Sequence, residues 1–171
     1  YSSAASDVYK RQVYRSMGIE YTGKGAVAAS VQAFQKRLEA ATIYLLKYLG
    51  ESLVKYAKDQ HNYTDQSGNL TNSIGYVVVQ NGTPVFYGEL NQPGEGAEAG
   101  LKLAMKIASQ TPNSFSLIIV AGMNYAAYVE AKGYNVILPA ELKAKADFPA
   151  AMNKLIEKAR SKAIELYGNV A

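Results

Sequence analysis

Few side chains in this chain have the chemistry that catalysis or metal binding requires. The 171 residues include no cysteine and a single histidine, His61. Thiolate nucleophiles, disulfides and cysteine-ligated zinc sites are therefore excluded, and a Ser-His-Asp triad could draw only on His61. The carboxylates nearest to it in the sequence, Asp59 and Asp65, are too few for a transition-metal site. We interpret His61 as a residue at the C-terminal turn of a helix, where it interacts favourably with the helix dipole, and we expect no cofactor or metal.

A polar stretch, YTDQSGNLTNSIG at Tyr63–Gly75, is a second candidate for chemistry. It has an internal glycine and several hydroxyl groups, as phosphate-binding loops do. A P-loop, however, needs GxxxxGK[ST] between a strand and a helix, whereas this stretch has no lysine and precedes its strand. We therefore predict a structural turn, in which Asp65, Ser67 or Asn69 accepts backbone N–H bonds. The predicted turn residues are Ser67, Gly68, Asn69, Leu70 and Ser73.

The stretch GMNYAAYVEAKG at Gly122–Gly133 places aromatic side chains on one face of a short helix. Tyrosine suits interfaces because one end of the side chain is apolar and the other forms hydrogen bonds. Glu130 could be a general acid in an apolar pocket, but with no partner acid or histidine it more naturally pairs with a cation or caps a backbone. The stretch could therefore form a subunit contact, pack in the core of the fold or take part in chemistry. We predict a subunit interface of Tyr125, Tyr128, Val129 and Glu130.

Basic residues recur near the end of the chain, and the formal net charge is +4 with a pI near 9.1. Acidic residues lie among them, which is typical of a solvated helix face with ion pairs at i,i+4. The alternative is loose attraction to DNA phosphates along a channel, without base readout. The residues concerned are Lys154, Lys158, Arg160 and Lys162, with Glu157 and Glu165.

A long amphipathic helix is predicted from residue 27 to about residue 59. Apolar residues recur there at alternating spacings of four and three, a helical pattern close to a heptad repeat. About 30 residues would span roughly 45 Å, more than the core of so small a domain needs. The helix could cross a sheet, or part of its apolar face could pack on a neighbouring subunit. The residues of this stripe are Val27, Val31, Phe34, Leu38, Ala41, Leu45 and Tyr48, widened by Ile43, Leu46, Leu49 and Leu53.

The rest of the chain predicts a single α+β domain with a small, mainly antiparallel sheet of about four strands. Short β-branched runs indicate strands, Asn81-Gly82 indicates a hairpin, and the other helices follow from helical spacing. Pro139 should open the last helix, and Pro149 should kink it or split off its first turn. The predicted strands are 74–79, 85–90 and 115–121, with a short strand or an extended segment at 135–138. The predicted later helices are 97–109, 125–131 and 139–167.

Residues 1–12, YSSAASDVYKRQ, resemble a translated sequencing adapter rather than natural coding sequence. We expect residues 1–17 to be a non-native or disordered leader and residues 18–171 to form the domain. No apolar run approaches the length of a membrane span, so we expect no membrane association.

The two stretches described first resemble paired motifs of the neck or tail-completion proteins of tailed bacteriophages. In that family a "tG.L..SI" turn feeds the first strand, as Ser67–Ile74 would here, and a "YA.YVE" segment follows a later strand, as Tyr125–Glu130 would. The motifs occur in the family's order, about 50 residues apart, and the similarity covers roughly residues 32–168.

This resemblance implies a structural virion protein without enzymatic activity. Such a protein would multimerise as a ring around the DNA channel and join the head to the tail, or complete the tail. Its expected partners are further copies of itself and other neck, connector or tail-tube proteins, with non-specific contact to DNA in the channel. It would be assembled in the cytoplasm of the bacterial host and reside in the virion. The alternative function is that of a small basic DNA-binding module.

Overall fold

The computed structural model describes residues 24–111 and 114–168. The chain divides into two compact units, residues 1–38 and residues 39–171. The described part of the first unit is the beginning of one long helix, and the second unit holds every other element. The leader expected at residues 1–17 lies outside the described residues.

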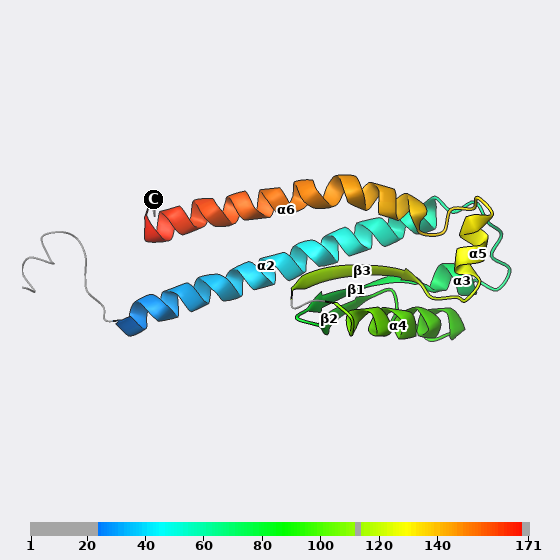
Figure 1. Ribbon diagram of the computed structural model, residues 1–171, viewed down its shortest axis with the longest axis horizontal. Helices are drawn as coiled ribbons and strands as arrows, with labels where there is room; N and C mark the ends of the chain where they lie inside the picture. Colours follow the sequence, from blue (N-terminus) through cyan, green and yellow to red (C-terminus); the bar gives the residue numbers. More distant parts are fainter. Residues whose placement is uncertain (1–23, 112–113, 169–171) are drawn as a thin grey trace, which may run out of the picture. The chain divides into compact units, whose positions relative to one another are not determined.

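The helices and the antiparallel strands form an α+β arrangement, which confirms the predicted fold class (Figure 1). A long helix comes first, a small sheet occupies the middle of the chain, and a second long helix ends it. The elements are α2 (Lys24–Asp59), α3 (Asn69–Asn72), β1 (Ile74–Gln80), β2 (Thr83–Gly88), α4 (Glu95–Ala108), β3 (Phe115–Ala121), α5 (Ala126–Ala131) and α6 (Leu138–Tyr167).

The sheet has three antiparallel strands in the order β2-β1-β3. β1 and β2 form the predicted hairpin, and both of its turn residues, Asn81 and Gly82, have positive φ angles of 52° and 75°. Two successive residues with positive φ are the mark of a type I′ turn, whose twist matches that of the strands. β1 is the central strand, and six of its seven residues are buried.

The two faces of β1 pack against different helices, because side chains alternate across a strand. Val77 and Val79 face a cluster that includes Ala104 and Ala108 of α4. On the other face, a second cluster unites the sheet with the second half of α2 and the beginning of α6. Its buried members are Ile74, Tyr76 and Val78 of β1, Leu46, Leu53, Val54 and Ala57 of α2, and Tyr63, Leu70, Ala126, Val136 and Ala140. Within the unit 39–171, the sheet is therefore covered on both faces (Figure 1).

The face of α2 that packs on the sheet differs from the predicted stripe. Leu46, Leu53 and Val54 are buried, whereas Val27, Val31 and Tyr48 of the stripe are exposed. Which face of a helix is buried depends on where the sheet lies, and the spacing of apolar residues does not contain that information. α2 carries two apolar faces, and the residues predicted only to widen the stripe form the core.

Of the two alternatives for residues 135–138, the short strand is not formed, and the described residues make a sheet of three strands instead of about four. The N–H groups of this segment bond elsewhere: that of Asn135 donates to Asn62 Oδ1 at 2.7 Å, and those of Ile137 and Leu138 donate to Glu130. They are therefore not available for a strand ladder. The helix α6 begins at Leu138 with Pro139 in its first turn, and it continues through Pro149 instead of being split there.

Candidate interaction surfaces

The two motif stretches meet at the side chain of Ser73, which is fully buried. Its Oγ donates to the carbonyl oxygen of Leu70 at 2.7 Å and accepts from the N–H groups of Gly122 at 3.1 Å and Met123 at 3.4 Å. The Gly122 N–H also lies 3.2 Å from the Ser73 carbonyl oxygen. One hydroxyl thus fixes the start of the Gly122–Gly133 stretch against the end of the Tyr63–Gly75 stretch.

The predicted turn residues lie around α3, a one-turn helix that the sequence did not predict. Gly68 precedes it with a φ of 75°, and Ser67 Oγ accepts the Asn69 N–H at 3.3 Å. Asp65 Oδ2 accepts the Thr71 N–H at 2.7 Å. Burial raises the pKa of Asp65, but hydrogen bonds from Thr71, Leu70 and Gly68 outweigh burial and leave the pKa below its ordinary value. Leu70 and Ser73 are buried, so this segment has a structural role in the fold.

Gly122 lies where α4 and the chain after β3 come closest. A Cβ atom added at Gly122 would lie 2.1 Å from the backbone nitrogen of Gly100 in α4. A side chain at Gly122 would push this segment away from α4, and a Cβ atom added at Gly100 would lie 2.6 Å from the Ser73 carbonyl oxygen. The glycine therefore supports the same junction that Ser73 holds through hydrogen bonds.

Glu130 caps the N-terminus of α6. Its Oε1 accepts the N–H groups of Ile137 at 2.9 Å and Leu138 at 2.6 Å, the residues at which the helix starts. A carboxylate is favourable there because the first N–H groups of a helix lack partners within it and carry partial positive charge. Of the interpretations open for Glu130, the geometry favours backbone capping within the fold.

The tyrosines predicted for the interface are exposed on α5. Tyr128 is 64% exposed and Tyr125 is 37% exposed, while Val129 is half-buried and packs on the core. The Lys132 Nζ lies 5.2 Å from the centre of the Tyr128 ring. We call Tyr125, Tyr128 and Lys132 the α5 surface.

His61 lies two residues beyond the end of α2 and is exposed. Its Nδ1 is 2.6 Å from the carbonyl oxygen of Lys58, in the last turn of the helix, and its ring packs at 4.9 Å from that of Tyr63. Because the carbonyl can only accept, this nitrogen donates. Within residues 24–111 and 114–168, no cluster of three histidine, cysteine or acidic side chains could hold a metal ion.

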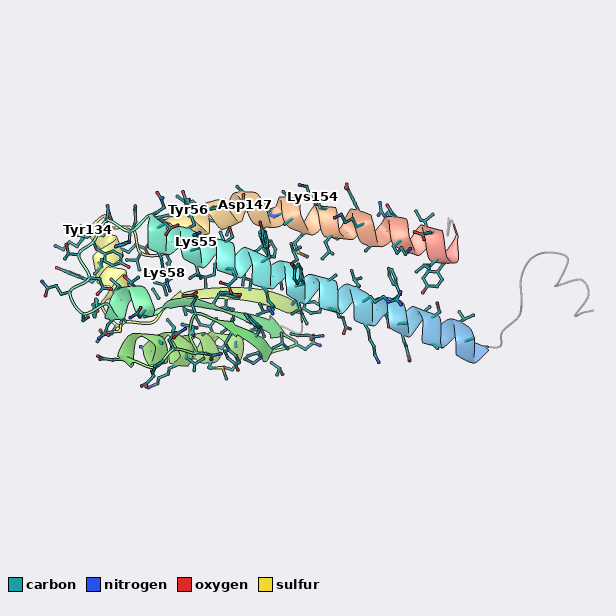
Figure 2. The ribbon with its side chains drawn as sticks, turned by 180° about the vertical axis from the view of Figure 1, so that it is seen from behind. Lys55, Tyr56, Lys58, Tyr134, Asp147 and Lys154 are labelled. Carbon is teal, nitrogen blue, oxygen red and sulfur yellow. The ribbon has the colours of Figure 1, made fainter. Side chains whose placement is uncertain are left out.

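A groove of about 750 Å³ lies between the second half of α2 and α6. The sequence gives no sign of this groove, because the spacing of apolar residues in α2 does not show that α6 lies beside it. On α2 it is lined by Ala41, Leu45 and Tyr48 of the predicted stripe, and on α6 by Ala151 and Leu155. The remaining lining residues are Tyr44, Leu49, Ser52, Lys143, Asp147, Ala150, Lys154 and Lys158. We call this the α2/α6 groove, and Figure 2 shows Asp147 and Lys154 on its α6 side.

Some of the charged side chains around the α2/α6 groove form ion pairs and others do not. Lys143 Nζ lies 2.6 Å from Asp147 Oδ2, and this contact raises the pKa of the lysine. Along the same helix Lys145 pairs with Glu141. Neither pair belongs to the predicted ion-paired face. Of the residues predicted for that face, Lys162 pairs with Glu165, at a spacing of i,i+3.

Two groove lysines lie outside these pairs. In the part of the chain that the structure describes, Lys154 and Lys158 form no ion pair, and both side chains are exposed. They leave the α6 side of the groove positively charged.

A second depression, of about 490 Å³, lies between α2 and Glu89. Polar and charged side chains around it bond to one another. The Tyr76 hydroxyl donates to Glu51 Oε1 at 2.9 Å, and Lys58 Nζ lies 2.8 Å from Glu89 Oε2. Burial and the nearby Glu51 raise the pKa of Tyr76, so its hydroxyl stays protonated. This arrangement stabilises the fold and offers no activated nucleophile.

Comparison of the chain with protein-family models, with curated proteins and with solved structures gives no match. Among the described residues, no helix combines the length and the apolar character that crossing a membrane requires.

Proposed function

We propose that the chain is a structural virion protein of a tailed phage or prophage, which multimerises around the DNA channel and joins the head to the tail or completes the tail. The proposal starts from the motif resemblance at Ser67–Ile74 and Tyr125–Glu130. The observation that supports it best is the exposure of Tyr128 on α5. Hydrogen bonds of the buried Ser73 hold the chain before this helix, and hydrogen bonds of Glu130 hold its end.

The hydrogen bonds at the two ends of α5 make its surface suited to protein contact. Ser73 holds the chain just before α5, and Glu130 ties its end to α6. A rigid aromatic surface loses little conformational entropy on binding, so more of its interaction energy remains as affinity. Exposed tyrosines on such a surface are typical of interface centres.

A second candidate function, a small basic DNA-binding module, is favoured by the unpaired cations of α6. Lys154, Lys158 and Arg160 form no ion pair within residues 24–111 and 114–168. Such a protein would bind duplex DNA as a monomer, with an affinity that falls steeply with salt.

Negative-stain electron microscopy of the purified chain at micromolar concentration tests the proposal. We expect ring-shaped particles, or chains seated on the ends of purified tail tubes. A protein that stays monomeric, ignores tail tubes and binds DNA in a strongly salt-dependent way would favour the second candidate instead.

A further inference from the structure

We propose that the α2/α6 groove binds one amphipathic helix of a partner protein, whose apolar face is flanked by acidic residues one turn apart. This surface is distinct from the α5 surface, so the inference goes beyond self-assembly and does not depend on it.

The dimensions of the groove fit a helix. Its lining runs from residue 41 to residue 52 on α2 and from residue 143 to residue 158 on α6. At 1.5 Å per residue these stretches are roughly 16 Å and 22 Å long, or three to four helical turns. A helix laid along them would bury three or four of its apolar side chains, as in other helix-in-groove complexes.

The floor of the groove is apolar and has room for side chains from another helix. Leu45 and Leu155 are half-buried, and the small side chains of Ala41, Ala150 and Ala151 leave space beside them. Small residues let the backbone of a third helix approach closely, while the leucines supply apolar contact area. The occupant should therefore present leucine-like side chains to the floor.

The two rims of the groove have different chemistry. On α2, Tyr44 and Tyr48 are 74% and 65% exposed; on α6, Lys154 and Lys158 carry the two unpaired charges. The two residues of each pair are four positions apart in the sequence, which is about 6 Å along a helix axis. An occupying helix with acidic residues at i and i+4 could form an ion pair with each of the two lysines. The other side of that helix would pack on the tyrosine rings.

Single-stranded nucleic acid, the other ligand with an affinity for tyrosines and lysines, fits less well. Bases could stack on Tyr44 and Tyr48, but a phosphate backbone is held by a denser row of cations than two lysines. The leucine and alanine floor would then face sugars and phosphates. Lys143 adds little positive charge, because Asp147 is bound to it.

Binding of synthetic peptides to the full chain, measured by fluorescence anisotropy, tests the proposal. The probe is an amphipathic helical peptide with leucines on one face and glutamates at i and i+4 beside them; a matched peptide carries lysines in their place. We expect the acidic peptide to bind and the lysine peptide to bind much more weakly. The double variant Lys154→Glu with Lys158→Glu should reverse this preference, and weaken binding of the acidic peptide at least about tenfold, which equals about 1.4 kcal/mol.

A charge-matched control separates the groove from the net charge of the protein. Lys102 and Lys106 are exposed, four residues apart, and lie on α4 at the opposite face of the sheet. The double variant Lys102→Glu with Lys106→Glu should bind the acidic peptide as the wild type does, as should Tyr128→Ser. Tyr48→Ser should weaken binding without reversing the charge preference.

Several outcomes would overturn the proposal. The first is that the Lys154→Glu, Lys158→Glu variant and the Lys102→Glu, Lys106→Glu variant lose binding of the acidic peptide to the same extent. The others are that the wild type binds the acidic and the lysine peptide equally well, or does not bind the acidic peptide at all. Binding of an oligo(dT) strand that needs Lys154 and Lys158, without peptide binding, would assign the groove to nucleic acid. Loss of self-association in the Lys154→Glu, Lys158→Glu variant, without peptide binding, would assign it to a second copy of the chain. A monomeric wild type that still binds the acidic peptide would contradict the proposed ring and leave the groove proposal standing.

Discussion

The ring of Tyr76 in β1 lies directly against the backbone of Gly50 in α2. A Cβ atom added at Gly50 would be 2.4 Å from two carbons of that ring, and one added at Gly88 would be 1.9 Å from its other edge. Tyr76 is fully buried and cannot swing away from either residue. The absence of a side chain at Gly50 therefore lets α2 approach the sheet this closely.

We predict that Gly50→Ala destabilises the protein, although alanine is the better helix former. Overpacking against an immobile ring typically costs about 1 to 3 kcal/mol, more than the roughly 1 kcal/mol that alanine gains in helix propensity. Gly25→Ala is the matched control, because it lies in the same helix and its added Cβ would meet nothing within 4 Å. Urea unfolding followed by circular dichroism measures both. Equal stability of the two variants would contradict the close contact.

Ser73→Ala should cost about 1 to 3 kcal/mol of unfolding free energy, because it removes the buried hydroxyl that accepts the Met123 N–H and one of the two acceptors of the Gly122 N–H. Amide hydrogen exchange at Met123, and to a lesser degree at Gly122, should accelerate relative to β3, which ends at Ala121. Ser109→Ala, an exposed serine at the end of α4, should change stability by no more than about 0.5 kcal/mol. Unchanged exchange at Gly122 and Met123 would show that Ser73 does not hold the junction.

Glu130→Ala should destabilise the start of α6 by about 1 kcal/mol, the usual effect of removing a helix cap. Glu130→Gln keeps an acceptor oxygen and loses only the charge, so its effect should be intermediate. Hydrogen exchange at Ile137 and Leu138 reports the cap directly. If both variants exchange as the wild type does, the capping role is wrong.

Asp65 should make stability depend on pH in the acid range. Its pKa in the folded protein lies below the ordinary value of about 3.9, so the unfolded chain binds the proton more readily. The contribution of Asp65 is therefore present above the unfolded pKa, and it is lost as the pH falls through the folded pKa. Urea midpoints measured from neutral pH downward should fall less steeply in Asp65→Asn than in the wild type; parallel curves would contradict the hydrogen-bonded carboxylate.

Much of the fold could be predicted from local patterns, because strands and turns depend on neighbouring residues. The hairpin at Asn81 and Gly82 and the bounds of β3 at Phe115–Ala121 match the prediction. The contact of Ser73 with Gly122 spans 49 residues, and no local spacing encodes it.

The face of α2 that packs on the sheet and the α2/α6 groove were missed for a related reason. A helix with two apolar faces gives one broad pattern, and only the positions of the sheet and α6 decide which face is covered. The exposure of Tyr44 and Tyr48 is a property of packing between distant segments.

Mass photometry of the wild type, Tyr128→Ser and Tyr44→Ser at matched concentrations tests most directly whether the chain assembles through the α5 surface. We predict particles of several copies for the wild type and for Tyr44→Ser, and a shift to monomers for Tyr128→Ser, with circular dichroism showing that all three fold. Assembly of Tyr128→Ser to the same size as the wild type, or a wild type that is monomeric throughout, would contradict the proposed role of the α5 surface.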